Sequence, residues 1–119
     1  MIESDLVTHL KADTALTALV STRIYPMVAP QNVVKPYIIY LVVSDNSNQC
    51  LGGTIYQSDV RFQLDCWSTK YSDVKAIKTA VINAITGFKS SSSISVMDGY
   101  EDETLLYRQM IDFKLKEGV

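Results

Sequence analysis

Residues 59–66 alternate between polar and apolar side chains at every position, and this alternation is the strongest constraint on the fold. The apolar set is Val60, Phe62, Leu64 and Cys66, and the polar set is Asp59, Arg61, Gln63 and Asp65. A period of two puts each set on its own face, so the segment predicts a β-strand with one face on a core and one in water. A second alternating segment closes the chain, and its predicted core face holds Tyr107, Gln109, Ile111, Phe113 and Leu115. Both strands need another layer to cover their apolar faces.

Two apolar patterns with helical spacing can form that layer. The first consists of Ile2, Leu6, Leu10, Leu16, Leu19 and Val20. Asp13-Thr14 interrupts it, which predicts a helix, a break with a cap, and a short second helix. The other pattern consists of Val74, Ile77, Val81, Ala84, Ile85 and Phe88. For this helix we expect Ser72 as the N-cap, Asp73 in the first turn and Gly87 at the end.

The remaining segments predict further strands and their connections. Residues 37–44 are β-branched and aromatic on both faces, which favours a strand covered on both sides or within an assembly. The stretch from Arg23 to Pro36 holds three prolines and predicts an extended connector with at most edge pairing. We expect a polar loop over 45–53 and a serine-rich linker over 89–93. A strand over 94–100 should then lead into the acidic turn Glu101-Asp102-Glu103.

The order of these elements indicates an α+β fold. Hairpin-length connections favour a mostly antiparallel sheet of about four strands, with two α-helices packed on one face. At 119 residues the chain fits one domain, so we expect residues 1–119 to fold as a single unit.

The net charge and the N-terminal sequence exclude some classes of partner. A formal net charge of −2 provides no basic field, so we expect no direct binding to nucleic acid. The N-terminus carries Glu3 and Asp5 where a secretory signal would be basic, and no apolar run approaches the roughly 20 residues of a membrane span. We therefore expect a protein made in a cytoplasm-like compartment, with no membrane partner.

No set of residues predicts catalysis, a cofactor or a metal. His9 is the only histidine, and we expect it to be solvated, with at most a weak pair to Asp5. Cys66 is expected in the core as an inert thiol, and pairing of 37–44 with 59–66 would place it beyond disulfide reach of Cys50. The acidic residues Asp98, Glu101, Asp102 and Glu103 lack the spacing of a calcium loop. Gly52-Gly53 is not part of a phosphate-binding sequence motif, and it predicts a turn.

Protein contacts are better supported than chemistry. The basic residues expected on the outer sheet face are Arg61, Arg108, Lys114 and Lys116, interleaved with Asp59, Asp65 and Asp112. Mixed charge of this kind favours protein partners over nucleic acid. Tyr37 and Tyr107 are expected in the core. Trp67 and Tyr40 are expected on the opposite face, either in a subunit contact or packed under the proline-rich connector.

In their order and spacing these segments resemble the tail completion, or tail terminator, family of long-tailed bacteriophages. The resemblance covers nearly the whole chain, and Ser90–Tyr100 contributes little to it. It is carried by the opening helix and by Asp13-Thr14-Ala15-Leu16-Thr17-Ala18-Leu19-Val20, Arg23-Ile24-Tyr25-Pro26, Ala29-Pro30-Gln31, Pro36-Tyr37-Ile38-Ile39-Tyr40, Val60-Arg61-Phe62-Gln63-Leu64-Asp65-Cys66-Trp67, Tyr71 and Gly87-Phe88.

The resemblance implies a structural protein of the virion and no catalysis. It implies a hexameric ring at the head-proximal end of the tail tube, which stops tube polymerisation and presents a surface for head attachment. The implied partners are other copies of the chain, the major tail tube protein and a head connector or head-completion protein. DNA would pass through the lumen without specific binding. No small-molecule substrate is implied.

We expect ring or tube contacts in the polar loop and in the acidic turn. The candidate residues are Asp45, Asn46, Asn48, Gln49, Tyr40, Trp67, Glu101, Asp102, Glu103 and Arg108. Three alternatives stay open, which are a neck adaptor of similar fold, a small hydrolase using Cys50 or His9, and a nucleic-acid-binding module.

Overall fold

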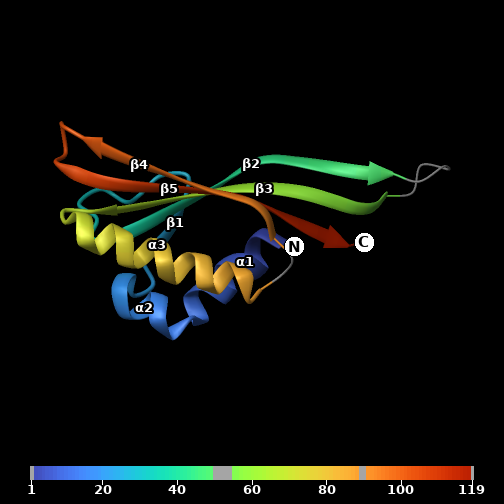
Figure 1. The fold of residues 1–119 in the computed structure, drawn as a ribbon, viewed down its shortest axis with the longest axis horizontal. Coiled ribbons are helices and arrows are strands. Elements are labelled where there is room, and N and C mark those ends of the chain that lie inside the picture. Colours follow the sequence, from blue (N-terminus) through green and yellow to red (C-terminus); the bar gives the residue numbers. More distant parts are fainter. Residues whose placement is uncertain (1, 50–54, 89–90, 119) are drawn as a thin grey trace.

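The computed structural model describes residues 2–49, 55–88 and 91–118, which form a five-stranded mixed sheet with three helices on one face (Figure 1). The helices are α1 (Ile2–Ala12), α2 (Thr14–Val20) and α3 (Tyr71–Thr86). The strands are β1 (Ile24–Pro26), β2 (Tyr37–Gln49), β3 (Ile55–Ser68), β4 (Ser91–Glu101) and β5 (Leu106–Gly118). They lie in the order β1-β2-β3-β5-β4, and β1 is parallel to β2 while the other pairs are antiparallel.

The α+β class is therefore confirmed, and the predicted counts of about four strands and two helices are too low. The extra strand is β1, where the Pro-containing connector pairs with the edge of β2 through Ile24 and Ile38. The extra helix arises because Asp13 separates α1 from α2. Asp13 has an extended backbone, and its carboxylate accepts a hydrogen bond from the Leu16 N–H at 2.9 Å. This is the predicted cap and break.

The ends of α3 differ in detail from the prediction. Ser72 lies inside the helix, and the N-cap position is Lys70, which makes no capping hydrogen bond through its side chain. Asp73 is in the first turn as predicted, where its carboxylate accepts a hydrogen bond from the Ser68 hydroxyl at 3.1 Å. Gly87 ends the helix as expected, with φ of −89° rather than the left-handed conformation common at such positions.

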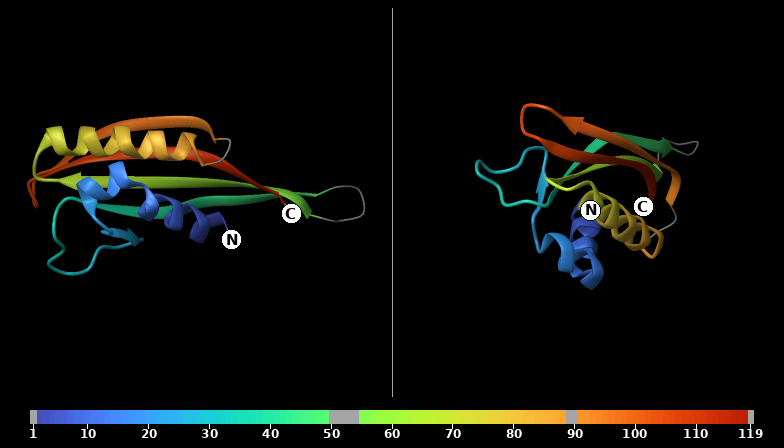
Figure 2. Two further views of the ribbon diagram at one scale, coloured as in Figure 1. Left: turned by 90° about the horizontal axis from the view of Figure 1, so that it is seen from below. Right: turned by 60° about the vertical axis from the view of Figure 1, so that its left-hand side comes forward.

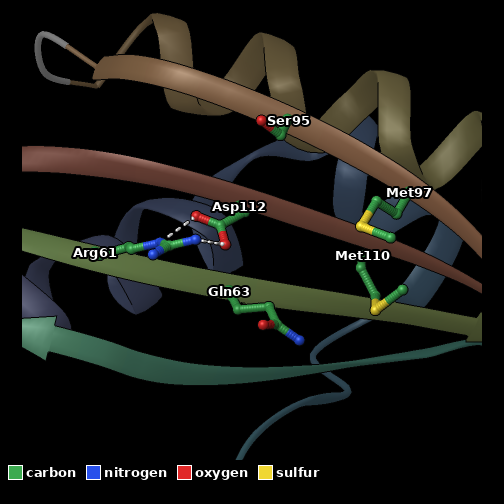
Figure 3. Close-up of a pocket in the computed structure, with 6 residues that line it drawn as sticks. All are labelled: Arg61, Gln63, Ser95, Met97, Met110 and Asp112. Atoms are coloured by element: carbon green, nitrogen blue, oxygen red, sulfur yellow. Dashed lines mark hydrogen bonds and ion pairs between the residues drawn. The ribbon is translucent and has the colours of Figure 1, made fainter.

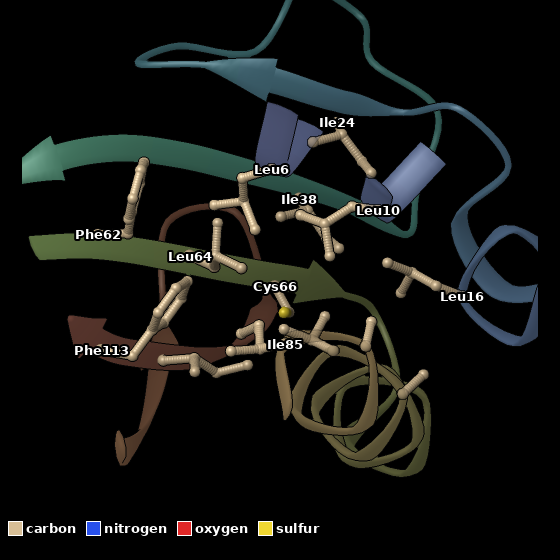
Figure 4. Close-up of a cluster of buried hydrophobic side chains, with 14 of the residues drawn as sticks. Leu6, Leu10, Leu16, Ile24, Ile38, Phe62, Leu64, Cys66, Ile85 and Phe113 are labelled. Atoms are coloured by element: carbon tan, nitrogen blue, oxygen red, sulfur yellow. The ribbon is translucent and has the colours of Figure 1, made fainter. Parts of the chain in front are cut away.

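The core lies between the helices and one face of the sheet (Figure 4). The two alternating segments face it as predicted, since Phe62, Leu64, Cys66, Ile111 and Phe113 are fully buried. The helical side is completed by the apolar stripes of the three helices, whose buried members include Leu6, Leu10, Leu16, Ile77, Val81 and Ile85. Gln109 also points inward and is fully buried, in agreement with the position predicted for it.

The central strands are longer than their apolar segments. Residues 45–49 continue β2 and pair with residues of β3, so the predicted loop over 45–53 is wrong for 45–49, while 50–54 lie outside the described residues. Polar side chains do not prevent this, because the backbone hydrogen bonds of the hairpin are independent of side-chain type. Likewise Ser91–Ser93 belong to β4 rather than to a linker, and residues 89–90 are outside the described ranges. The result is a long molecule of 52 × 29 × 25 Å, in which the β2–β3 hairpin projects past the helices (Figures 1 and 2).

Candidate interaction surface

In the described residues no helix covers the second face of the sheet, and this face holds a groove of about 250 Å³ (Figure 3). The groove is lined by Arg61 and Gln63 of β3, Met110 and Asp112 of β5, and Ser95 and Met97 of β4. Its walls are the positions that alternate with the core residues on the same strands. We call this uncovered side the outer face.

Opposite charges on the outer face pair with each other across neighbouring strands. Arg61 donates two hydrogen bonds of 2.8 Å to the Asp112 carboxylate, and this bonding raises the pKa of the arginine. Arg108 donates to Asp65 at 2.7 Å, and Gln63 also donates to Asp65, at 3.0 Å. Asp65 is buried beneath these donors, so its predicted position in water is wrong. Lys114, opposite Arg61 on this face, is exposed, so acidic and basic side chains are mixed here among the described residues.

An aromatic cluster occupies one end of the outer face. Tyr37 and Trp67 are opposite each other on β2 and β3, with ring centres 6.4 Å apart, and the Arg108 guanidinium lies 5.0 Å from the centre of the Trp67 ring. Burial raises the pKa of Tyr37, with a further contribution from Glu101. Trp67 Nε1 and Arg108 Nε are buried without a hydrogen-bond partner in the described part of the chain. Trp67 thus lies on the predicted face. Tyr37 was predicted in the core; it is buried, but it lies on the outer face.

Tyr40 faces the helices, which corrects the prediction that it shares a face with Trp67. It is opposite Leu64 in the β2–β3 ladder and packs against the core from a half-buried position. Burial raises the pKa of its phenol, with Glu3 as a second cause. The prediction is wrong because residues 37–44 are apolar on both faces of the strand, so the sequence does not indicate which face each residue takes.

The predicted contact residues lie at two ends of the sheet and do not form one site. Asp45 is exposed on β2, and the backbone positions of Asn46, Asn48 and Gln49 follow it toward the tip of the hairpin. The acidic turn Glu101–Glu103 lies at the opposite end, where all three residues are exposed and Glu101 accepts a hydrogen bond from the Thr104 hydroxyl at 2.8 Å. Arg108 lies near this second end, opposite Gly99 of β4.

A polar cluster around Asp98 was not predicted. The Asp98 carboxylate accepts hydrogen bonds from the Tyr71 hydroxyl at 3.1 Å, from Lys75 at 3.3 Å and from the Gln109 side chain. The Gln109 bond is the main reason that the pKa of Asp98 is lowered. Tyr107 lies between Tyr71 and Tyr100 at 5.6 and 4.9 Å, and is half-buried where the core was expected. The register of β4 and β5 and the packing of α3 against the sheet bring these residues together, so no local sequence signal could have revealed the cluster.

His9 and Cys66, which were considered for catalysis, pack against other side chains of the fold. His9 is half-buried, with Nε2 2.9 Å from the Ala84 carbonyl and its ring stacked on Phe88, so the expectation of a solvated side chain is wrong. Burial raises the pKa of the Cys66 thiol, and Cys50 lies outside the described residues. Among the residues described there is no group of three or more side chains placed to hold a metal ion. Within the same ranges, no helix has the length and apolar character of a membrane span.

The fold and surface together define an α+β protein with helices on one side of its sheet and an open face of paired charges on the other. Residues 4–116 match the model of the family described as Tail completion protein gp17, and the chain belongs to that family. The protein is accordingly a structural protein of a phage tail.

Solved structures agree on the fold. A chain in the structure of the virion of a native gene transfer agent particle superimposes with a TM-score of 0.72 at 19% sequence identity, covering 96% of this chain and 92% of that chain. A comparison with curated proteins gives no match.

Proposed function

We propose that this protein, with residues 1–119 acting as one domain, forms a ring of six copies at the head-proximal end of the phage tail tube. There it ends tube polymerisation and provides the surface to which the head attaches. The observation that carries the proposal is the match to the tail completion family over residues 4–116. The likeness in fold to a chain of a gene transfer agent virion supports a place in such a particle.

The surface of the molecule suits a role in protein assembly. Two ion pairs on the sheet face, Arg61–Asp112 and Arg108–Asp65, would keep their partners if this face were buried against another protein. The proposed partners are neighbouring copies, the major tail tube protein and a head connector or head-completion protein. Paired charge and a net charge of −2 also suit a lumen through which DNA passes without specific binding.

The two ends of the sheet are the proposed contact regions. One is the hairpin end with Asp45, Asn46, Asn48 and Gln49, and the other is the acidic turn Glu101–Glu103 with Arg108 and Trp67 nearby. Two separate contact regions are what a protein needs if it touches both a tube and a connector. Tyr40 is no longer a candidate, because it packs against the core.

The test is electron microscopy of lysates from a phage or prophage with a stop codon in this gene, beside the wild type. We expect overlong, headless tails, because tube growth would have lost its stop. Mature particles with tails of normal length would refute the proposal. Filled heads without tails, and without long tubes, would instead indicate a neck adaptor of similar fold.

A further inference from the structure

The sheet ends in two edges that are open along most of their length. On one side, β1 pairs with β2 from Ile38 to Tyr40, and Met27 N–H donates to the Tyr40 carbonyl. From Leu41 to Gln49 the outer edge of β2 pairs with nothing in the described residues. On the other side, β4 pairs with β5 alone, so in the described ranges its outer edge is open from Ser91 to Glu101.

These edges carry few of the features that usually prevent strands from pairing with other chains. Proteins commonly protect an edge with lysine, proline or a bulge. Residues 41–49 and 91–101 contain no Lys, Arg or Pro. β2 has two irregularities in its pairing, between Val42 and Ser44 and between Asn48 and Gln49, and β4 has one, between Ser92 and Ser95. Regular strand remains over 44–48 and 95–101, long enough to form a ladder with a partner strand.

Exposed apolar side chains accompany both edges. Val43 of β2 is 42% exposed, and Met97 and Tyr100 of β4 are 63% and 50% exposed. Large apolar side chains beside an open strand are typical of a surface that becomes covered, since an added strand would bury them while it pairs the free backbone groups.

We propose that the open edge of β2 in one copy pairs with the open edge of β4 in the next, so that the sheet continues from subunit to subunit. This inference rests on the proposed ring and names the surface that builds it. Each neighbouring pair from β2 through β3 and β5 to β4 is antiparallel, so β2 and β4 run in opposite directions. A second copy added in the same orientation therefore presents its β2 antiparallel to β4.

The use of two different edges explains why assembly would give a ring. A contact between unlike surfaces is heterologous, and it repeats from copy to copy until rotation closes it. A contact of β4 with β4 would be isologous and would stop at two copies.

Cross-linking in assembled tails tests this contact. Ser44→Cys and Ser95→Cys are combined in a Cys50→Ser background and expressed in the stop-codon strain, leaving only the buried Cys66 in addition. Purified tails are treated with a short bis-maleimide. Within one chain β3 and β5 separate β2 from β4, a span of about 14 Å for three strand spacings, which is too far for the reagent. Between paired edges the thiols come within its reach even at a diagonal register.

We expect the double variant to give a ladder of covalent multimers, from dimer upward, on a denaturing gel. Neither single variant should give this ladder. The matched control is Ser44→Cys with Thr79→Cys, whose second cysteine lies exposed on α3, and it should give no ladder. Dimers from either single variant would overturn the head-to-tail arrangement, because they require like edges to meet. If the first pair fails to restore tail length, Val43→Cys with Met97→Cys replaces it at two exposed positions on the same edges.

Failure of this contact can be distinguished from failure of the proposed function. Overlong tubes without the gene, combined with complemented tails of normal length that give no ladder, would overturn the edge pairing and leave the terminator role intact. A ladder in the complemented tails would support the edge pairing whatever length the stop-codon tails have.

Discussion

The two faces of the sheet are made by the same strands and yet have opposite properties. On the inner face, Phe62 and Phe113 are fully buried and stack at 5.7 Å under the helices. One residue away along the same strands, Arg61 and Asp112 form a partly exposed ion pair on the outer face. Folding energy therefore comes mainly from one face, which leaves the other free to meet partners. Substitutions on the two faces should accordingly separate stability from assembly.

The largest expected effect is on the inner face. Phe113→Ala should lower the free energy of unfolding by about 3–5 kcal/mol, because it removes a large buried ring and leaves a cavity. Met97→Ala on the outer face should change it by less than about 0.5 kcal/mol, because the methionine is 63% exposed. Urea denaturation of both variants measures the difference. Similar losses from the two substitutions would mean that the outer face contributes to the fold as much as the inner one.

The inner face was predictable because its residues have a period. Strict alternation in β3 and β5 and helical spacing in α3 predicted most of the buried residues. Val60, Phe62, Leu64 and Cys66 of β3 and Ile111, Phe113 and Leu115 of β5 are in the core, whereas Tyr107, predicted on the same face, is only half-buried. Tyr40 was placed wrongly because β2 is apolar on both faces. The extension of β2 through 45–49 was missed because hairpin pairing, not side-chain polarity, holds those residues in the strand.

The second prediction divides the outer face into a buried and an exposed part. Arg108→Met should lower the free energy of unfolding by about 1–3 kcal/mol, since Asp65, with 8% of its side chain exposed, would lose its main charged partner. Arg61→Met is the matched control, and it should lower the free energy of unfolding by less than about 1 kcal/mol because that pair is more exposed to water. Equal losses of stability in thermal or urea unfolding would show that the burial of an ion pair on the outer face does not determine its contribution to stability.

The candidate contacts were less predictable than the core. Polar residues in turns and at strand ends stood out in composition, and Glu101–Glu103 are exposed in the turn expected for them. Which of them lie near one another depends on strand order and register, and these place Asp45 and Glu101 at opposite ends of the sheet. The free edges of β2 and β4 likewise follow from the strand order alone, which no local pattern encodes.

The third prediction concerns the helix layer that covers the inner face. Asp13→Ala should cost about 1 kcal/mol, because the Leu16 N–H would lose its acceptor at the start of α2. Asp13→Asn keeps a side-chain oxygen at the cap and should recover most of that loss. The two variants are compared by urea denaturation. Equal destabilisation by alanine and asparagine would show that the carboxylate acts through its charge and not as a cap.

The smallest effect is expected where the two faces meet, at the Asp98 cluster on the edge strand. Hydrogen bonds from Gln109, then Tyr71 and Lys75, hold the pKa of Asp98 below its ordinary value of 3.8. A carboxyl whose pKa is lower in the folded state stabilises the fold above the unfolded value, and that contribution disappears as the pH falls through the folded value. The free energy of unfolding should therefore decrease with acid between about pH 5 and pH 2, and Asp98→Asn should reduce that decrease. Asp102→Asn, which changes an exposed carboxylate in the neighbouring turn, is the matched control. If both variants keep the wild-type acid dependence in urea titrations across this range, the hydrogen bonds to Asp98 do not couple its protonation to folding.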